Sequence, residues 1–185
     1  MGNFFSEHVK YVIGLGNPGS NYKYTLHNLG FILVDYLLSQ CTAEKVALKH
    51  SDIWKTHGLI LCKPKTYMNL SGQALKELKN MSKLQPYEFV RSILVVHDDV
   101  GLDMYQIRYK DGTNSWGLGG HNGLRSIVGE FGNMGLTKDN AAQFDRLRLG
   151  CSTNYTGSLA DHVLKSMNKA EVTEWVRAID RYFHG

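Results

Sequence analysis

Short apolar runs alternate with longer amphipathic stretches along this chain. Several of the runs are rich in Val, Ile or aromatic residues, as is typical of β-strands. The predicted strands cover residues 10–14, 53–57, 59–63, 92–97, 105–110 and 144–150.

Apolar residues at helical spacing predict helices over residues 29–40, 72–84, 122–128 and 169–183. The inward face of the first helix is predicted to hold Leu29, Ile32, Leu33, Tyr36 and Leu37. For the second and the last helix, the predicted inward residues are Ala74, Leu75, Leu78 and Met81, and then Val172, Trp175, Val176 and Ile179.

Polar residues and one proline mark the expected helix ends. We expect Asn28 and Ser71 to cap the first two helices through their side chains. Pro86 is expected to end the second helix. Either His121 or Asn122 opens the third.

The alternation of strands and helices predicts an α/β fold, with a mixed central sheet flanked by helices. Ligands of such sheets collect where strands end and loops meet. Asn17 follows the first predicted strand, and the sequence His97-Asp98-Asp99 ends the fourth. We therefore expect the functional site at these strand ends.

The composition narrows the class of protein. The chain has 185 residues, of which 43% are hydrophobic, and this fits one globular domain over residues 1–185. No apolar run approaches the roughly 20 residues that a membrane span needs. The three cysteines and eight histidines show neither disulfide nor zinc spacing, which indicates a reducing compartment and no metal. A net charge of +4 permits a nucleic-acid partner without requiring one.

A glycine motif after the first strand offers one alternative function. Gly14, Gly16 and Gly19 have the G-x-G-x-x-G spacing of dinucleotide-binding proteins. However, the residues after Gly19 are polar and aromatic where that motif requires an apolar helix. Asp35 also lies inside a helical pattern, whereas the ribose-binding acid should end the second strand. Nicotinamide binding is therefore the minor hypothesis.

Five segments carry most of the polar chemistry of the chain: residues 14–28, 63–72, 95–99, 119–126 and 144–150. Together, and in this order, they resemble the bacterial-type peptidyl-tRNA hydrolase family between about residues 12 and 150. The resemblance implies a single α/β domain without a cofactor. It also implies hydrolysis of the ester that joins a peptide to the 3′-terminal ribose of tRNA, which recycles tRNA from prematurely released chains.

The resemblance assigns a base and its carboxylate partner. His27 matches the catalytic histidine of the family, and Asp98 matches the acid that accepts a hydrogen bond from it. An imidazole suits this reaction, because water at neutral pH needs a base of similar pKa. Without the family context, His27 would be a surface cap and Asp98 a turn residue. Asp99 is expected to be solvated, His97 to pack or make a local bond, and His121 to order its loop.

The resemblance also assigns binding residues. Asn17, Asn69 and Asn122 match amide positions that hold water, the peptide carbonyl or the developing oxyanion, although each could also be a turn or cap residue. Met68 and Tyr22 match residues that line the substrate groove, and Lys110 and Arg146 match the basic pair that grips the acceptor-end phosphate. Arg146 and Arg148 alternate along a strand and should share a face. The helical stripe Lys76, Lys79 and Lys83 is either a solvated face or an RNA contact.

Some positions depart from the family pattern. Leu26 stands where the family usually has arginine, and the tail after Gly150 matches loosely. The main alternative from another class is a non-catalytic RNA-binding module on the same fold. Retention of His27, Asp98 and the three asparagines argues against it, because binding alone does not require a base paired with an acid. The family usually acts as a monomer, and we expect a cytoplasmic or, in a eukaryote, an organellar location.

Overall fold

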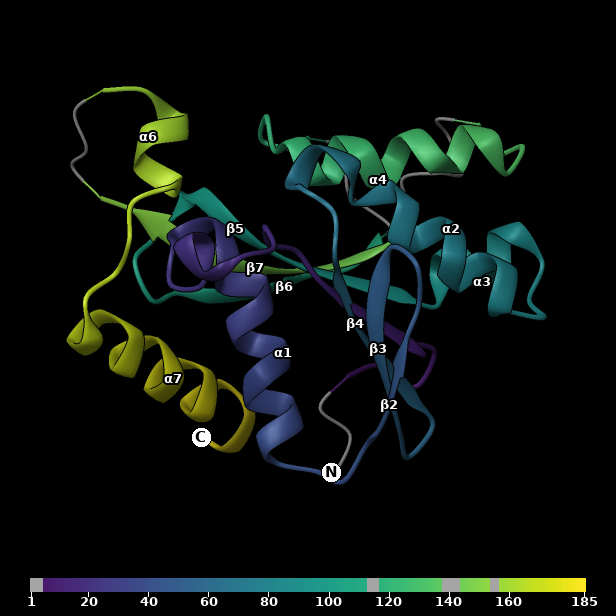
Figure 1. Ribbon diagram of the computed structural model, residues 1–185, viewed down its shortest axis with the longest axis horizontal. Coiled ribbons are helices and arrows are strands. Elements are labelled where there is room, and N and C mark those ends of the chain that lie inside the picture. Colours follow the sequence, from purple (N-terminus) through teal and green to yellow (C-terminus); the bar gives the residue numbers. More distant parts are fainter. Residues whose placement is uncertain (1–4, 113–116, 138–143, 154–156) are drawn as a thin grey trace.

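The centre of the molecule is a seven-stranded mixed sheet with the strand order β2-β3-β4-β1-β5-β7-β6. The computed structural model describes residues 5–112, 117–137, 144–153 and 157–185. Strand β1 pairs in parallel with β4 and β5, and β5 pairs in parallel with β7. The two edges are antiparallel (Figure 1). The strands are β1 (Tyr11–Gly14), β2 (Glu44–Ala47), β3 (Ser51–Thr56), β4 (Leu59–Pro64), β5 (Ile93–Asp103), β6 (Ile107–Lys110) and β7 (Asp145–Ser152).

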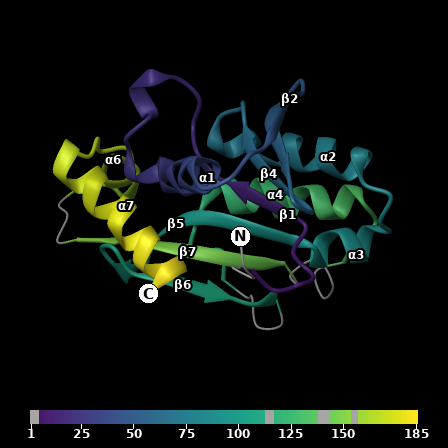
Figure 2. The same cartoon turned by 90° about the horizontal axis from the view of Figure 1, so that it is seen from below.

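Helices cover both faces of this sheet. Figures 1 and 2 show α1 and α7 on one face and α2, α3 and α4 on the other. The α-helices are α1 (Leu29–Ser39), α2 (Gly72–Met81), α3 (Pro86–Arg91), α4 (Asn122–Asn133), α6 (Leu159–Val163) and α7 (Lys169–His184). Short 3-10 turns are η1 (Ser20–Tyr22), η2 (Leu26–Asn28) and η3 (Met68–Leu70). The predicted α/β class with a mixed sheet between helices is confirmed.

The two helical layers give two separate hydrophobic cores, because strand side chains alternate between faces. In β5, Leu94 and Val96 pack with α1 and α7, whereas Ile93 and Val95 pack with α2 and α4. All five predicted inward residues of α1 are buried. In α2 and α7, by contrast, Met81 and Val176 are exposed, so these two predictions were wrong.

Several predicted boundaries also need correction. Strand β2 and helices α3 and α6 were not predicted, and α2 ends at Met81, three residues earlier than expected. Pro86 does not terminate α2 but starts α3, where proline's fixed φ suits the first helical position. Neither Asn28 nor Ser71 caps its helix through its side chain. Asn28 instead bonds the backbone of Asn17.

The glycines at the end of β1 and just after it allow the chain to pack closely against α1. A Cβ atom at Gly14 would lie 2.3 Å from the carbonyl oxygen of Gly30 in α1, and one at Gly16 would lie 2.7 Å from the ring of Phe31. After Gly19 the chain forms the short turn η1, and α1 begins only at Leu29. The strand–turn–helix geometry of a dinucleotide site is therefore not formed at this motif.

The fold brings distant polar segments to one end of the parallel strands. Strands β4 and β1 end there, and the loops after them carry Asn69 and Asn17. Asp98 lies in β5 just beyond Val96, which pairs with the last residue of β1; the predicted end of this strand at Asp99 was wrong, because β5 continues to Asp103. None of the helices formed by the described residues is long and apolar enough to cross a membrane.

Candidate active site

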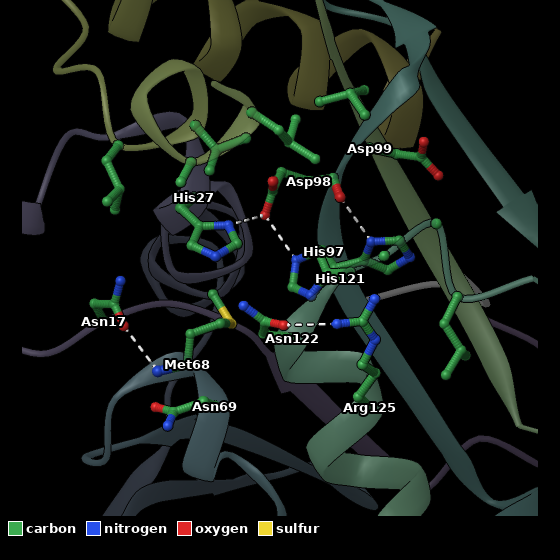
Figure 3. A pocket seen from close by; sticks show the side chains of 18 of the residues that line it. Asn17, His27, Met68, Asn69, His97, Asp98, Asp99, His121, Asn122 and Arg125 are labelled. Carbon is green, nitrogen blue, oxygen red and sulfur yellow. Dashed lines mark hydrogen bonds and ion pairs between the residues drawn. The ribbon is translucent and has the colours of Figure 1, made fainter. Parts of the chain in front are cut away.

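A cavity of about 650 Å³ lies at the carboxyl ends of these parallel strands. It is polar on one side, where side chains from β5, α4 and the loops after β1 and β4 meet (Figure 3). The other side is apolar and includes residues of α6, a part of the tail that sequence analysis did not assign. The polar lining comprises Asn17, His27, Asn69, His97, Asp98, Asp99, His121, Asn122 and Arg125.

His27 and Asp98 meet in this cavity although 71 positions separate them in the chain. Nδ1 of His27 lies 2.8 Å from Oδ1 of Asp98, and the Asp98 side chain is only 3% exposed. Asn28 holds the His27 turn in place, because its amide bonds both the N–H and the carbonyl of Asn17 at 2.8 and 2.9 Å. With Nδ1 donating to the carboxylate, Nε2 of His27 is the ring nitrogen that can accept a proton.

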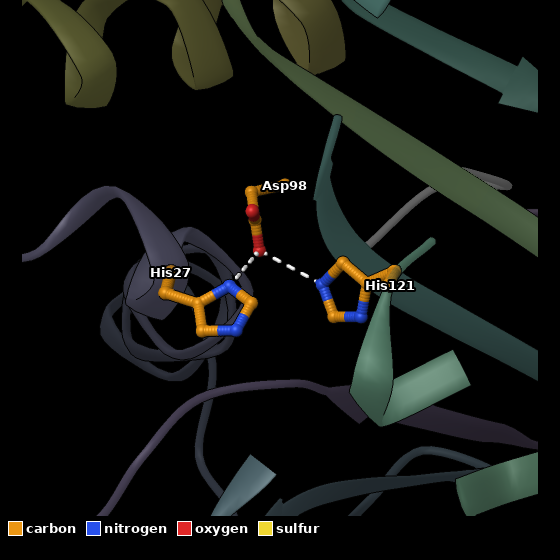
Figure 4. A group of neighbouring side chains, drawn as sticks. All are labelled: His27, Asp98 and His121. Atoms are coloured by element: carbon orange, nitrogen blue, oxygen red, sulfur yellow. Dashed lines mark hydrogen bonds and ion pairs between the residues drawn. The ribbon is translucent and has the colours of Figure 1, made fainter. Parts of the chain in front are cut away.

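A second histidine shares the same carboxylate oxygen (Figure 4). Nε2 of His121 lies 2.9 Å from Oδ1 of Asp98. Its other nitrogen, Nδ1, accepts the N–H groups of Gly123 and Leu124 at 3.1 and 3.4 Å and so caps α4. These acceptor contacts place the proton of neutral His121 on Nε2. His121 orders its loop, as expected from the sequence, but its contact with Asp98 was not predicted.

The environment keeps Asp98 ionised. Burial alone would raise the pKa of its carboxyl, but the interactions with His121 and His27 outweigh burial and hold this pKa well below its ordinary value. Two N–H donors that converge on one buried oxygen favour the charged form. Asp98 can therefore stabilise positive charge on a neighbouring imidazole throughout the neutral pH range.

His97 is held neutral beneath the cavity. Its side chain is buried, and Nδ1 lies 2.8 Å from the carbonyl oxygen of Asp98. Burial, followed by the neighbouring His121, lowers the pKa of His97 to about 3. The predicted packing role of His97 agrees with this placement. Asp99, by contrast, is not a solvated residue, because its Oδ2 accepts the Nε–H of Arg148 at 2.7 Å.

The amides of two asparagines have defined orientations. Oδ1 of Asn17 accepts the N–H of Met68 at 2.8 Å, and Oδ1 of Asn122 accepts Nη1–H of Arg125 at 3.1 Å. Because only oxygen can accept these bonds, each amide keeps its NH₂ group for another partner. Asn69 also lines the cavity, at an exposed position.

The predicted groove residues take different positions. Met68 lines the cavity and is almost fully buried. Tyr22 is not among the lining residues, and its ring instead meets that of Tyr67 edge to face at 6.2 Å. Tyr67 itself lines the cavity and is exposed, although sequence analysis did not select it.

The predicted phosphate-binding residues do not line the cavity; they lie on β6 and β7, at one edge of the sheet. Lys110 and Arg146 are register partners of β6 and β7, so they share a sheet face, which Arg148 also shares. Burial, followed by the nearby arginines, lowers the pKa of Lys110. Arg146 is buried and donates Nη1–H to the carbonyl of Gly117 at 3.1 Å. The stripe Lys76, Lys79 and Lys83 does not line the cavity.

One group of side chains has the composition of a metal site. The nearest ligand atoms of His27, Asp98 and His121 lie within 4.8 Å of one another. However, both histidines direct a proton, not a lone pair, at the carboxylate. Coordination through Nε2 of His121 would move its proton to Nδ1, which faces two backbone N–H donors. This arrangement therefore suits proton transfer better than metal binding.

Comparisons with known proteins agree on one family. Residues 11–184 match the family model described as peptidyl-tRNA hydrolase, which extends the resemblance well beyond residue 150. A protein of this name from Rickettsia africae is 38% identical in an alignment of 177 positions that covers 92% of this chain and 87% of that protein. The one from Phytoplasma mali is 40% identical in an alignment of 164 positions that covers 84% of each chain.

A solved structure gives the same result. The crystal structure of peptidyl-tRNA hydrolase from Acinetobacter baumannii matches with a TM-score of 0.75 and 32% identity. The match covers 95% of this chain and 85% of that chain.

Proposed function

Since the chain belongs to the peptidyl-tRNA hydrolase family and hydrolyses peptidyl-tRNA, we propose that His27 is the general base of this reaction. The observation that carries the proposal is the 2.8 Å contact between Nδ1 of His27 and the buried carboxylate of Asp98. It fixes the tautomer in which Nε2 holds a lone pair at the cavity. Membership of an enzyme family also sets aside the alternative of a non-catalytic RNA-binding module.

The proposed reaction begins with a water molecule beside His27. Nε2 takes a proton from this water, and the water oxygen forms a bond to the ester carbonyl carbon. The resulting imidazolium is stabilised by the Asp98 carboxylate. When the bond from carbon to the ribose oxygen breaks, His27 returns the proton to that oxygen. The products are a peptide with a free carboxyl group and a tRNA with a free terminal hydroxyl.

The asparagines supply neutral donors for the charge that develops on the carbonyl oxygen. The NH₂ groups of Asn17 and Asn122 are left available by their bonds to Met68 and Arg125. Donors that are oriented before the reaction stabilise an oxyanion without reorganisation. We assign Asn69 and Met68 to contacts with the peptide or terminal nucleotide, and Tyr22 to an outer contact through Tyr67.

The remaining assignments concern the RNA and the state of the protein. Lys110 and Arg146 are the proposed contacts of the acceptor-end phosphate, supported by their shared sheet face. We also propose that the protein acts as a monomer, as the family resemblance implies. We place the protein in the cytoplasm, where its substrate is made.

The proposal is tested by replacing His27 with alanine. We expect His27→Ala to lower kcat on an N-blocked aminoacyl-tRNA by about 10²–10⁴-fold, the usual contribution of a general base, with little change in tRNA affinity. His57→Asn is the matched control, because His57 is an exposed histidine on the β3–β4 turn whose φ of 30° asparagine tolerates. A His27→Ala protein with the activity of the control would refute the assignment.

A further inference from the structure

Of the described residues that line the cavity, Arg125 alone carries a permanent positive charge, and it lies beside an asparagine that the proposed reaction uses. It stands on the first turn of α4, three positions after Asn122, where side chains of a helix are neighbours. Its Nη1 lies 3.1 Å from Oδ1 of Asn122 (Figure 3). Among the described residues, no carboxylate forms an ion pair with Arg125. The two acids of the cavity are engaged elsewhere, Asp98 with His27 and His121 and Asp99 with Arg148.

The chemistry of the guanidinium decides the orientation of the Asn122 amide. Arginine has five N–H donors and no acceptor, so the atom of Asn122 that contacts it must be the carbonyl oxygen. An amide side chain has two orientations related by a half turn, and a neighbouring donor selects one of them. The NH₂ group then points away from Arg125, toward His27 and Met68, as Figure 3 shows.

We propose that Arg125 is a positioning residue, which holds the Asn122 amide with its NH₂ group toward the ester that is hydrolysed. This inference rests on the proposed function, since it assigns the Asn122 NH₂ to the developing oxyanion. In the opposite orientation the amide oxygen would face that oxyanion. One favourable hydrogen bond would thereby become a repulsion between two partial negative charges.

The loop before α4 lies next to the Arg125 side chain. Gly120 has a φ of 74°, and a Cβ atom at this position would make an ordinary contact, 3.7 Å from Nη2 of Arg125. His121 fixes the start of the same helix through its contacts with Gly123 and Asp98. The backbone before Asn122 is therefore held in place by His121. The orientation of the Asn122 amide is set separately, by its hydrogen bond with Arg125.

The test compares three replacements of Arg125 that differ only in what they can donate or accept. Arg125→Lys keeps a pure donor and should retain kcat within about threefold. Arg125→Ala leaves the amide free and should lower kcat by about five- to tenfold, the value of one hydrogen bond. Arg125→Glu accepts only and should reverse the amide, with a loss of about 10²-fold, comparable to removal of an oxyanion donor. KM should change little in all three.

The same three replacements in an Asn122→Ala background separate positioning from direct RNA binding. If Arg125 acts through Asn122, the three double variants should have equal kcat values, no lower than that of Asn122→Ala alone. Persistence of the order Lys, Ala, Glu in this background, or a weaker salt dependence of KM in Arg125→Ala than in the wild type, would overturn the proposal. It would indicate a contact between Arg125 and a phosphate.

Two controls keep the outcome clear. Arg91→Ala removes another exposed arginine that bonds a neighbouring side chain, the Tyr87 hydroxyl at 3.0 Å, and should leave kcat unchanged. Wild-type activity in all Arg125 variants, together with an inactive His27→Ala, would refute the positioning role and leave the proposed function intact. An active His27→Ala would instead refute the proposed function.

Discussion

Replacement of Asp98 by asparagine tests the centre of the site with the smallest change in shape. Asp98 is 3% exposed, and its Oδ1 accepts from His27 and His121 at 2.8 and 2.9 Å. Asparagine keeps the size of the side chain but loses the negative charge. At an effective dielectric constant of about 20, an imidazolium roughly 4 Å from a carboxylate is stabilised by about 4 kcal/mol. Because each 1.36 kcal/mol is tenfold in rate, we expect kcat to fall by about 10³-fold.

Steady-state hydrolysis of an N-blocked aminoacyl-tRNA measures this effect, and thermal unfolding checks that the variant is folded. Asp99→Asn is the matched control. Asp99 is the adjacent acid, but it bonds Arg148 rather than His27 or His121. We expect the control to lose less than about tenfold, the value of a single hydrogen bond. A folded Asp98→Asn protein with kcat within tenfold of the wild type would refute the role of the carboxylate.

The pH dependence gives a second measurement on the same variant. The folded-state pKa of Asp98 lies below its ordinary value, so its contribution to stability is present above the unfolded pKa and is lost only as the pH falls through the folded one. Asp98 therefore stays charged at pH 5–7, and a loss of wild-type activity in that range does not come from its titration. The difference in stability between the wild type and Asp98→Asn, measured by thermal unfolding, should therefore stay constant between pH 5 and 7.

Two further predictions concern the RNA contact and the absence of a metal requirement. Lys110→Ala should raise KM and reduce the slope of log K against log salt by about 0.7–0.9, the amount for one neutralised phosphate; an unchanged slope in binding titrations would contradict the assignment. Treatment with a chelator should leave the rate of hydrolysis unchanged, because a base and oriented amides carry the proposed reaction. Inhibition by the chelator that zinc reverses would contradict the metal-independent mechanism.

The sequence predicted those helices and strands whose buried residues form a regular apolar pattern along the chain. The apolar face of α1 recurs at helical spacing and is buried as expected. Strand β2 was missed because its residues are mostly exposed, and it is held by pairing with β3 rather than by an apolar pattern of its own. Met81 matches the helical spacing of α2, but it is the last residue of that helix, and its side chain is exposed.

The same reasoning explains what could be predicted of the site. His27 and Asp98 were selected through a family resemblance, and the fold places them in contact. The bond between His121 and Asp98 joins two elements and has no local signal in the sequence. Arg125 was missed for the same reason, because an arginine on the first turn of a helix resembles any solvated residue until the cavity beside it is known.

The groups around Asp98 come from segments that lie far apart in the sequence. The sequence separation is 71 positions for His27 and Asp98, and 23 positions for Asp98 and His121. Such long-range closures form late and slowly during folding. Catalytic competence should therefore appear only in the final folding step. Turnover regained during refolding should report the intact molecule more strictly than circular dichroism, which follows helices and strands that can form earlier.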